Sequence, residues 1–131
     1  MSAFLKLKKR KDFVRAAKVG EKVVATSVIL QAAQSLSDVS VAPKFGFTTT
    51  KKLGHAVVRN RIRRRMRAAV RELHTEARGN TEYVLIGRRL TANCDFDILR
   101  RDLKYALHKV NRLLYHEENK TNYPTSADLA D

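Results

Sequence analysis

The chain has 131 residues and a formal charge of +14, because 27 Lys or Arg face only 13 Asp or Glu. This length suits one domain with a modest core, and the charge indicates an anionic partner, either nucleic acid or an anionic membrane surface. No apolar run approaches the roughly 18 residues of a membrane span. The first residues lack the apolar stretch of a signal peptide, and the single cysteine, Cys94, cannot form an intrachain disulfide. We therefore expect a cytoplasmic protein.

The first part of the chain predicts a helix followed by strands. Residues 9–18 have helical spacing and are followed by Gly20, a helix stop signal. The inner face of this helix would carry Phe13, Val14 and Ala17. The run VVATSVILQAAQ from residue 23 favours a strand. Residues 35–40 are polar enough for a turn into a second strand at about residues 41–50.

Residues 51–71, KKLGHAVVRNRIRRRMRAAVR, hold nine Lys or Arg, and no acid occurs between Asp38 and Glu72. Apolar residues recur there at helical intervals on one stripe: Val58, Ile62, Met66, Ala69, Val70 and Leu73. The opposite side carries Asn60, Arg63, Arg64, Arg67 and Arg71, with Arg61 and Arg65 on the flanks. The stretch therefore predicts an amphipathic helix that ends near Ala77, before the stop signal Gly79-Asn80.

The remaining elements complete a small α/β fold. The run YVLIGR at residues 83–88 indicates a strand buried on both faces. Candidate N-caps for a final helix are Thr91, Asn93 and Asp95. Its apolar stripe would consist of Phe96, Leu99, Leu103, Ala106, Leu107, Val110 and Leu114. We expect a single domain at residues 1–116 and a polar, disordered tail at residues 117–131.

No set of residues predicts a protein active site or a metal site. Asp95 and Asp97 are close in sequence, but they lie at a helix start, where acids complement the helix dipole. The four histidines have no metal-ligand spacing with one another or with Cys94, and no serine lies in a nucleophile motif. We therefore predict no catalytic residue and no metal ligand in this chain.

The central helix predicts binding to nucleic acid. Its cations between residues 59 and 71 are all arginine, whose planar fork suits phosphate contacts and stacking on bases. A merely solvated face would interleave both signs of charge. A membrane-bound helix would carry aromatic anchors, and no helix-turn-helix pair points to the DNA major groove. Phe13, Phe45 and Phe47 are candidates for stacking on single-stranded RNA, although core packing is favoured for Phe45 and Phe47.

The basic stretch resembles the signature of the protein subunit of bacterial ribonuclease P. The matching residues are Arg59-Asn60-Arg61-Ile62-Arg63-Arg64, on a helix that follows a Lys51-Lys52-x-Gly54 loop. The resemblance extends to the opening pattern from Leu7 to Gly20, the strand at residues 83–86 and the final helix, about 110 of the 131 residues. It implies a two-layer α/β sandwich of the ribosomal S5 domain 2-like type, mostly a four-stranded sheet with three helices and a left-handed βαβ crossover.

The resemblance also implies a function, the removal of the 5′ leader from precursor tRNA by a ribonucleoprotein endonuclease. A catalytic RNA with Mg²⁺ would carry the chemistry, and the protein would bind this RNA and the leader. The residues implied to face the RNA are Lys51, Lys52, Arg59, Asn60, Arg61, Arg63, Arg64 and Arg67. Phe13, with Lys9 beside it, would line a leader cleft between the first helix and the sheet. Mg²⁺ would be held by RNA and substrate, with no metal site on the protein and with neither a membrane nor DNA as partner.

Three positions depart from the family pattern. Ala17 and Gln31 stand where members often carry an aromatic residue and a tyrosine, and His55 replaces a frequent asparagine. We therefore expect a cleft that stacks fewer bases and relies more on Ile29, Gln31 and contacts to backbone phosphates. The alternatives are a structural RNA chaperone or ribosomal-type protein without a role in cleavage, and a protein nuclease that acts alone.

Overall fold

The computed structural model describes residues 4–37 and 39–115. The strands are β1 (Leu5–Lys6), β2 (Glu21–Val24), β3 (Val28–Gln34), β4 (Lys44–Thr48) and β5 (Thr81–Gly87). The α-helices are α1 (Arg10–Val19), α2 (Ala56–Leu73), α3 (Arg89–Asn93) and α4 (Phe96–Leu114), and short 3₁₀ turns lie at Lys51–Leu53 and His74–Glu76. The predicted domain end at residue 116 and the tail at residues 117–131 lie outside the described residues.

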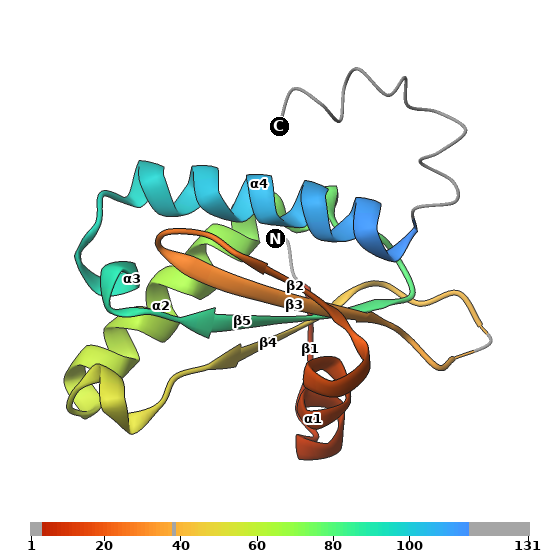
Figure 1. Cartoon of the computed structure of the whole chain (residues 1–131), viewed down its shortest axis with the longest axis horizontal. Coiled ribbons are helices and arrows are strands. Elements are labelled where there is room, and N and C mark those ends of the chain that lie inside the picture. The colour runs from red at the N-terminus through yellow and green to blue at the C-terminus, as the bar shows by residue number, and fades with distance from the viewer. Residues whose placement is uncertain (1–3, 38, 116–131) are drawn as a thin grey trace.

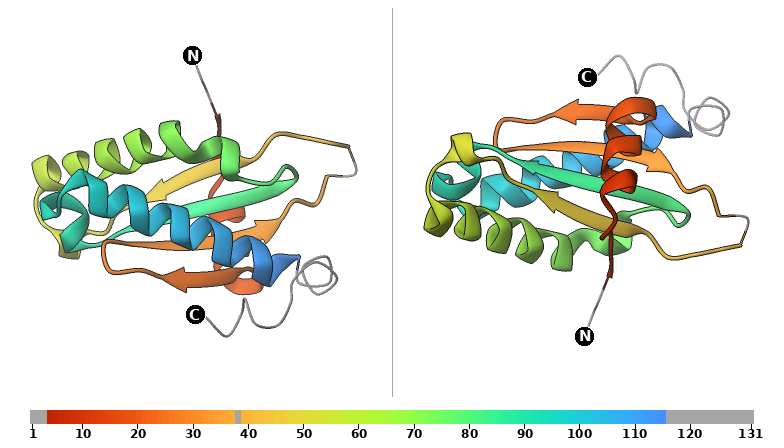
Figure 2. Two further views of the ribbon diagram at one scale, coloured as in Figure 1. Left: turned by 90° about the horizontal axis from the view of Figure 1, so that it is seen from above. Right: turned by 90° about the horizontal axis from the view of Figure 1, so that it is seen from below.

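The strands form one sheet in the order β1-β4-β5-β3-β2. β4 and β5 are parallel neighbours, and β3 is antiparallel to both β5 and β2. Helices α2 and α4 cover one face of the sheet, and α1 crosses the other face (Figures 1 and 2). The α/β sandwich is therefore confirmed. The first helix, α1, lies on the face of the sheet away from the main core.

The connection from β4 through α2 to β5 is a left-handed crossover, as the resemblance implied. In the left view of Figure 2, α2 lies on the viewer's side of the sheet, and β4 and β5 both point to the left with β5 below β4. When that view is turned so that the strands point up, β5 lies to the left of β4. General chirality rules favour the opposite hand.

The sheet has five strands where four were expected, and the difference arises in two places. The run that predicted one strand from residue 23 is a hairpin, because the chain turns back between β2 and β3. Both Ser27 N and Ser27 Oγ donate to Asp102 Oδ2, at 2.9 and 2.7 Å, and this anchors the turn to α4. The partner is 75 positions away, so local composition could not reveal the break. The fifth strand is the two-residue β1, which pairs with β4.

A fourth α-helix, α3, also differs from the three that were expected. Thr91 Oγ1 accepts a hydrogen bond from Arg88 N at 2.9 Å and donates to the Ser27 carbonyl at 2.5 Å. Thr91 therefore stabilises the first turn of α3. Of the three candidate caps, Asp95 occupies the N-cap position of α4.

The remaining helices are confirmed, but α2 ends at Leu73, before a 3₁₀ turn at His74–Glu76, and not near Ala77 as predicted, and a few face assignments differ. α1 ends at Gly20 as expected, but its buried residue is Ala16, whereas Val14 and Ala17 are exposed because that side of the helix faces an open groove. The stripe of α2 is buried from Ile62 to Leu73, whereas Val58 is 37% exposed because it lies at the end of the helix that extends beyond the core.

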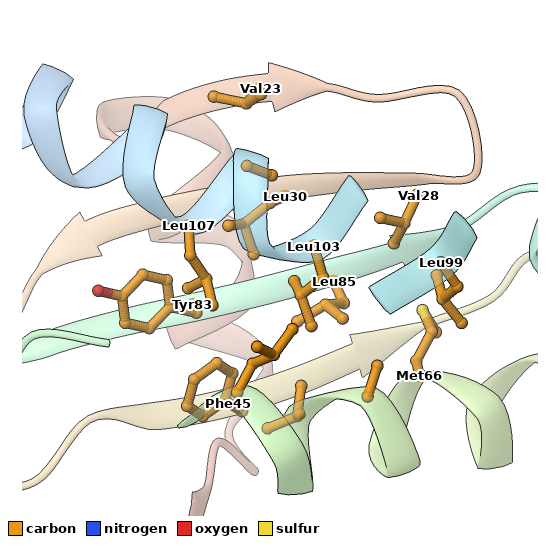
Figure 3. Packing of buried hydrophobic residues seen from close by; sticks show 14 of the residues in the cluster. Val23, Val28, Leu30, Phe45, Met66, Tyr83, Leu85, Leu99, Leu103 and Leu107 are labelled. Atoms are coloured by element: carbon orange, nitrogen blue, oxygen red, sulfur yellow. The ribbon is translucent and has the colours of Figure 1, made fainter. Parts of the chain in front are cut away.

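The main core lies between the sheet and the two long helices (Figure 3). Phe45 is fully buried and stacks on Tyr83 with 5.0 Å between ring centroids, so core packing is confirmed for Phe45. Tyr83 Oη donates to Asn111 Oδ1 at 2.6 Å and accepts from Arg78 N at 2.9 Å. Burial raises the pKa of Tyr83 to about 12, although these hydrogen bonds partly oppose the shift. Phe47 also packs against this core.

Candidate nucleic-acid interface

Helix α2 divides its residues between the core and an exposed cationic face. Ile62, Met66, Ala69 and Val70 are fully buried against the sheet and α4. Asn60, Arg61, Arg64 and Arg71 are exposed, and Arg59, Arg63 and Arg67 are partly exposed. The predicted separation of apolar and cationic faces is therefore confirmed.

Most polar contacts of the α2 arginines go to neutral acceptors rather than to acids. Arg59 Nη1 donates to the Gly54 carbonyl at 3.2 Å, Arg61 Nε to the Ala92 carbonyl at 2.9 Å, and Arg63 Nη1 to Asn60 Oδ1 at 3.0 Å. A neutral oxygen orients a guanidinium but leaves its full charge, so these side chains remain available to an anion. Neither Arg64 nor Arg67 forms a hydrogen bond or ion pair with another described residue.

Arg65 differs from the other arginines of α2 because it supports the fold. Its Nη2 donates to the Cys94 carbonyl, and its guanidinium lies 5.8 Å from the centre of the Phe96 ring. Arg65 Nε is buried without a partner among the described residues. Arg65 thus links α2 to the segment between α3 and α4, and the sequence offered no signal that separated it from its neighbours.

The loop before α2 adds two more cations. Lys51 and Lys52 are exposed in the 3₁₀ turn. Gly54 follows with φ of 134°, a conformation that disfavours any side chain. The Lys52 carbonyl accepts a hydrogen bond from Arg89 Nη2 at 3.2 Å. The predicted Lys51-Lys52-x-Gly54 loop therefore adjoins the cationic face of α2, and His55 lies exposed at the N-cap of the helix.

Glu72, near the end of α2, forms an ion pair with Arg100 of α4. Arg100 Nε and Nη2 donate to the two carboxylate oxygens of Glu72 at 2.5 and 3.3 Å, and Arg100 also pairs with Asp97. These hydrogen bonds from Arg100 lower the pKa of Glu72. The one acid of α2 therefore binds an arginine of another helix, and the cationic face keeps its charge.

On the opposite face of the sheet, a groove of about 590 Å³ runs beside α1. The groove is lined by the apolar residues Phe13, Val14, Ala17, Phe47, Val84 and Ile86 and by the polar residues Lys8, Arg10, Gln31 and Thr48. Phe13 is half-buried, and a Cβ atom on Gly46 would lie 2.5 Å from Phe13 Cζ. The Phe13 ring therefore packs directly on the backbone of β4, where only glycine leaves room for it.

Two of the predicted cleft residues lie outside this groove. Lys9 is exposed at the N-cap of α1, but Lys8 and Arg10 line the groove in its place. Ile29 lies on the same face of the sheet, opposite Ile86 in the register, and borders a neighbouring pocket of about 380 Å³ beside Leu53 and Arg88. Phe13 and Gln31 do line the groove, so the structure brings together two of the four residues.

Ile86 and Thr48 also line the groove, which the sequence did not predict. The strand at residues 83–88 was predicted to be buried on both faces, and Val84 is indeed only 2% exposed. Ile86 is partly exposed at the groove. Thr48 and Ile86 are paired neighbours in the register of β4 and β5. This register follows only from the tertiary structure, so the sequence carried no signal for these two groove residues.

Comparison with known proteins agrees with this arrangement. The family model described as Ribonuclease P matches residues 1–111. The Ribonuclease P protein component of Paramagnetospirillum magneticum is 42% identical over 128 residues, which cover 95% of this chain and 92% of that protein. The chain belongs to the ribonuclease P protein family. A second relative of the same name, from Gluconacetobacter diazotrophicus, is 46% identical over 105 residues, covering 79% of this chain and 89% of its own length.

Solved structures of ribonuclease P proteins share the fold. An RNase P protein mutant from Staphylococcus aureus superimposes with a TM-score of 0.70 at 23% identity, covering 81% of this chain and 87% of the other. The RNase P protein from Thermotoga maritima gives a TM-score of 0.69 at 22% identity, covering 80% and 96% respectively. The sheet and helices that hold the groove and the cationic face are therefore those of the ribonuclease P protein fold.

Within residues 4–37 and 39–115, no three His, Cys, Asp or Glu side chains gather as metal ligands would. Several acids already have partners: Glu82 pairs with Arg15, Glu76 with His108, and Asp102 with Ser27. No helix in the same residues is both long and apolar enough to cross a membrane.

Proposed function

We propose that this chain is the RNA-binding protein of a ribonuclease P ribonucleoprotein that removes the 5′ leader from precursor tRNA. The observation that carries the proposal is the cationic face of α2, which has no carboxylate partner among the described residues. Family membership supports the same conclusion. The catalytic RNA performs the hydrolysis, and the protein contributes binding and positioning.

The cationic face of α2 and its loop bind the catalytic RNA and the substrate close to the cut. Arginine forks suit phosphate oxygens, and Arg59, Arg61 and Arg63 are already oriented by neutral acceptors. Lys51 and Lys52 extend the positive surface toward the end of β4. Contacts of this kind make affinity depend steeply on salt.

The groove beside α1 holds the single-stranded leader. Phe13 offers one ring face for stacking, and Val14, Ala17 and Ile86 provide an apolar wall for bases. Lys8 and Arg10 at one end of the groove neutralise backbone phosphates. Ala17 adds no second ring, so the groove stacks few bases and binds leaders with little sequence preference.

Mg²⁺ belongs to the RNA in this proposal. The ion prefers carboxylate and phosphate oxygens and keeps much of its water. The described carboxylates form no cluster and several are already paired, so the donor set does not fit a dedicated magnesium site on the protein. Phosphates of the catalytic RNA and the substrate offer the ligands instead.

Cleavage assays with precursor tRNA test the proposal. Purified protein, the catalytic RNA, and both together are incubated with precursor tRNA at low and high Mg²⁺. We expect cleavage only when the RNA is present, with enhancement by the protein at low Mg²⁺. Cleavage by the protein alone would show a protein nuclease. Binding without any enhancement would show an RNA chaperone. Either result would refute the proposal.

A further inference from the structure

Helix α1 crosses the strands on its face of the sheet (Figure 2). Its two sides border two different grooves. The groove proposed for the leader lies on one side. The other, of about 460 Å³, lies on the opposite side of α1, near the start of β4 and of β5. Its cationic lining consists of Lys6, Lys8, Lys9, Lys11, Arg15 and Lys44. We call it the lysine groove.

The charge of the lysine groove is largely uncompensated. Its buried acid, Glu82, is 8% exposed and pairs with Arg15 at 3.3 Å, so these two groups neutralise each other. Arg15 also donates to the Gln34 carbonyl, which holds it at the floor. Among the described lining residues, five lysines then face one further carboxylate, that of Asp12.

The two grooves meet at the start of α1. Lys8 lines both, and Lys9, Arg10 and Lys11 continue a basic ridge around the first turn of the helix. At its other side the leader groove includes Thr48, three residues before Lys51 and the loop of α2. A single-stranded RNA leader that begins at the α2 loop and follows the leader groove therefore reaches Lys8 and then the lysine groove.

We propose that the lysine groove binds the phosphate backbone of leader nucleotides upstream of those held beside Phe13. The inference rests on the proposed function, because the direction of the strand follows from a cut near α2. The lysine groove offers amines and no exposed ring, so it recognises phosphates and not bases. Its contribution to affinity depends on leader length and not on leader sequence.

The test compares precursor tRNAs with leaders of about four and about twelve nucleotides, lengths within the range that one single-strand-binding domain covers. The variant Lys11→Ala/Lys44→Ala removes two amines that line only the lysine groove. We expect an affinity loss of about five- to tenfold for the long leader and little change for the short one. The slope of log affinity against log salt concentration should become shallower by about 1.4 for the long leader, or about 0.7 per lost phosphate contact.

The matched control is Lys18→Ala/Lys22→Ala, which removes the same charge from exposed positions outside both grooves. It should not discriminate between leader lengths. Thermal unfolding of both variants checks that the fold is intact. An equal loss for both leaders, or no loss for either, would overturn the inference. If the wild-type protein bound mature and leader-bearing tRNA equally, the proposed function itself would fail, which is a distinguishable result.

Discussion

Replacing Phe13 by alanine tests whether the leader groove works by stacking. One side of the ring packs on Gly46, so the opposite side can take a single base. A base stacked on an aromatic ring contributes about 1–3 kcal/mol, so the variant should lose about five- to 150-fold in affinity for leader-bearing tRNA. Because Phe13 is half-buried, the variant should also lose about 2 kcal/mol of folding stability, roughly half the cost of a fully buried phenylalanine.

The assay measures binding of precursor and mature tRNA by the complex of the protein with its catalytic RNA. Phe13→Leu is the matched control, since leucine refills much of the space over Gly46 but offers no ring for stacking. We expect this variant to recover most of the stability and little of the leader affinity. Phe13→Ala should leave binding of mature tRNA nearly unchanged.

Two results would refute this reasoning. Equal losses for precursor and mature tRNA would show that Phe13 only supports the fold around α1. Full recovery of leader affinity by Phe13→Leu would show that the groove recognises apolar volume and not a ring face.

Three further predictions concern other parts of the molecule. Arg64→Ala/Arg67→Ala should lower the salt slope of binding to the catalytic RNA by roughly 1.4–1.8 with a nearly unchanged melting temperature; an unchanged slope would contradict the role of α2. Gly46→Ala should displace the Phe13 ring and cost about 1–3 kcal/mol of stability, measured by denaturant unfolding. The Tyr83 pKa of about 12 lies above its ordinary value of 10, so the neutral hydroxyl of Tyr83 contributes its full folding stability below pH 10. The free energy of unfolding should fall by up to about 3 kcal/mol as the pH rises through 12. Alkaline unfolding curves should show this loss for the wild-type protein and not for Tyr83→Phe.

The faces of α2 were predictable because they follow from the local spacing of residues. A helix turns by about 100° per residue, so the positions of Ile62, Met66 and Val70 determine where the arginines point, whatever the rest of the chain does. The same holds for the stripe of α4 and for the stop of α1 at Gly20. The Arg59-Asn60-Arg61 signature and its loop also carried the resemblance that family membership confirms.

Features that depend on distant partners were not predictable. The hairpin between β2 and β3 is anchored by Asp102, and the short helix α3 depends on contacts of Thr91 with Ser27. Local composition carries no trace of a hydrogen-bond partner that lies more than 60 positions away, as these do. A continuous run of β-favouring residues therefore predicted a single strand.

For this protein, the sequence by itself determined the cationic helix, its Arg-only charge and the family, since periodicity and charge are properties of neighbouring residues. Only the tertiary structure decided that Phe13 lies on Gly46, that Ile29 lies outside the leader groove, and that Lys8 joins two grooves on either side of α1. Grooves form between elements that meet through long-range packing and strand register. Their lining therefore follows from the fold and not from the order of residues along the chain.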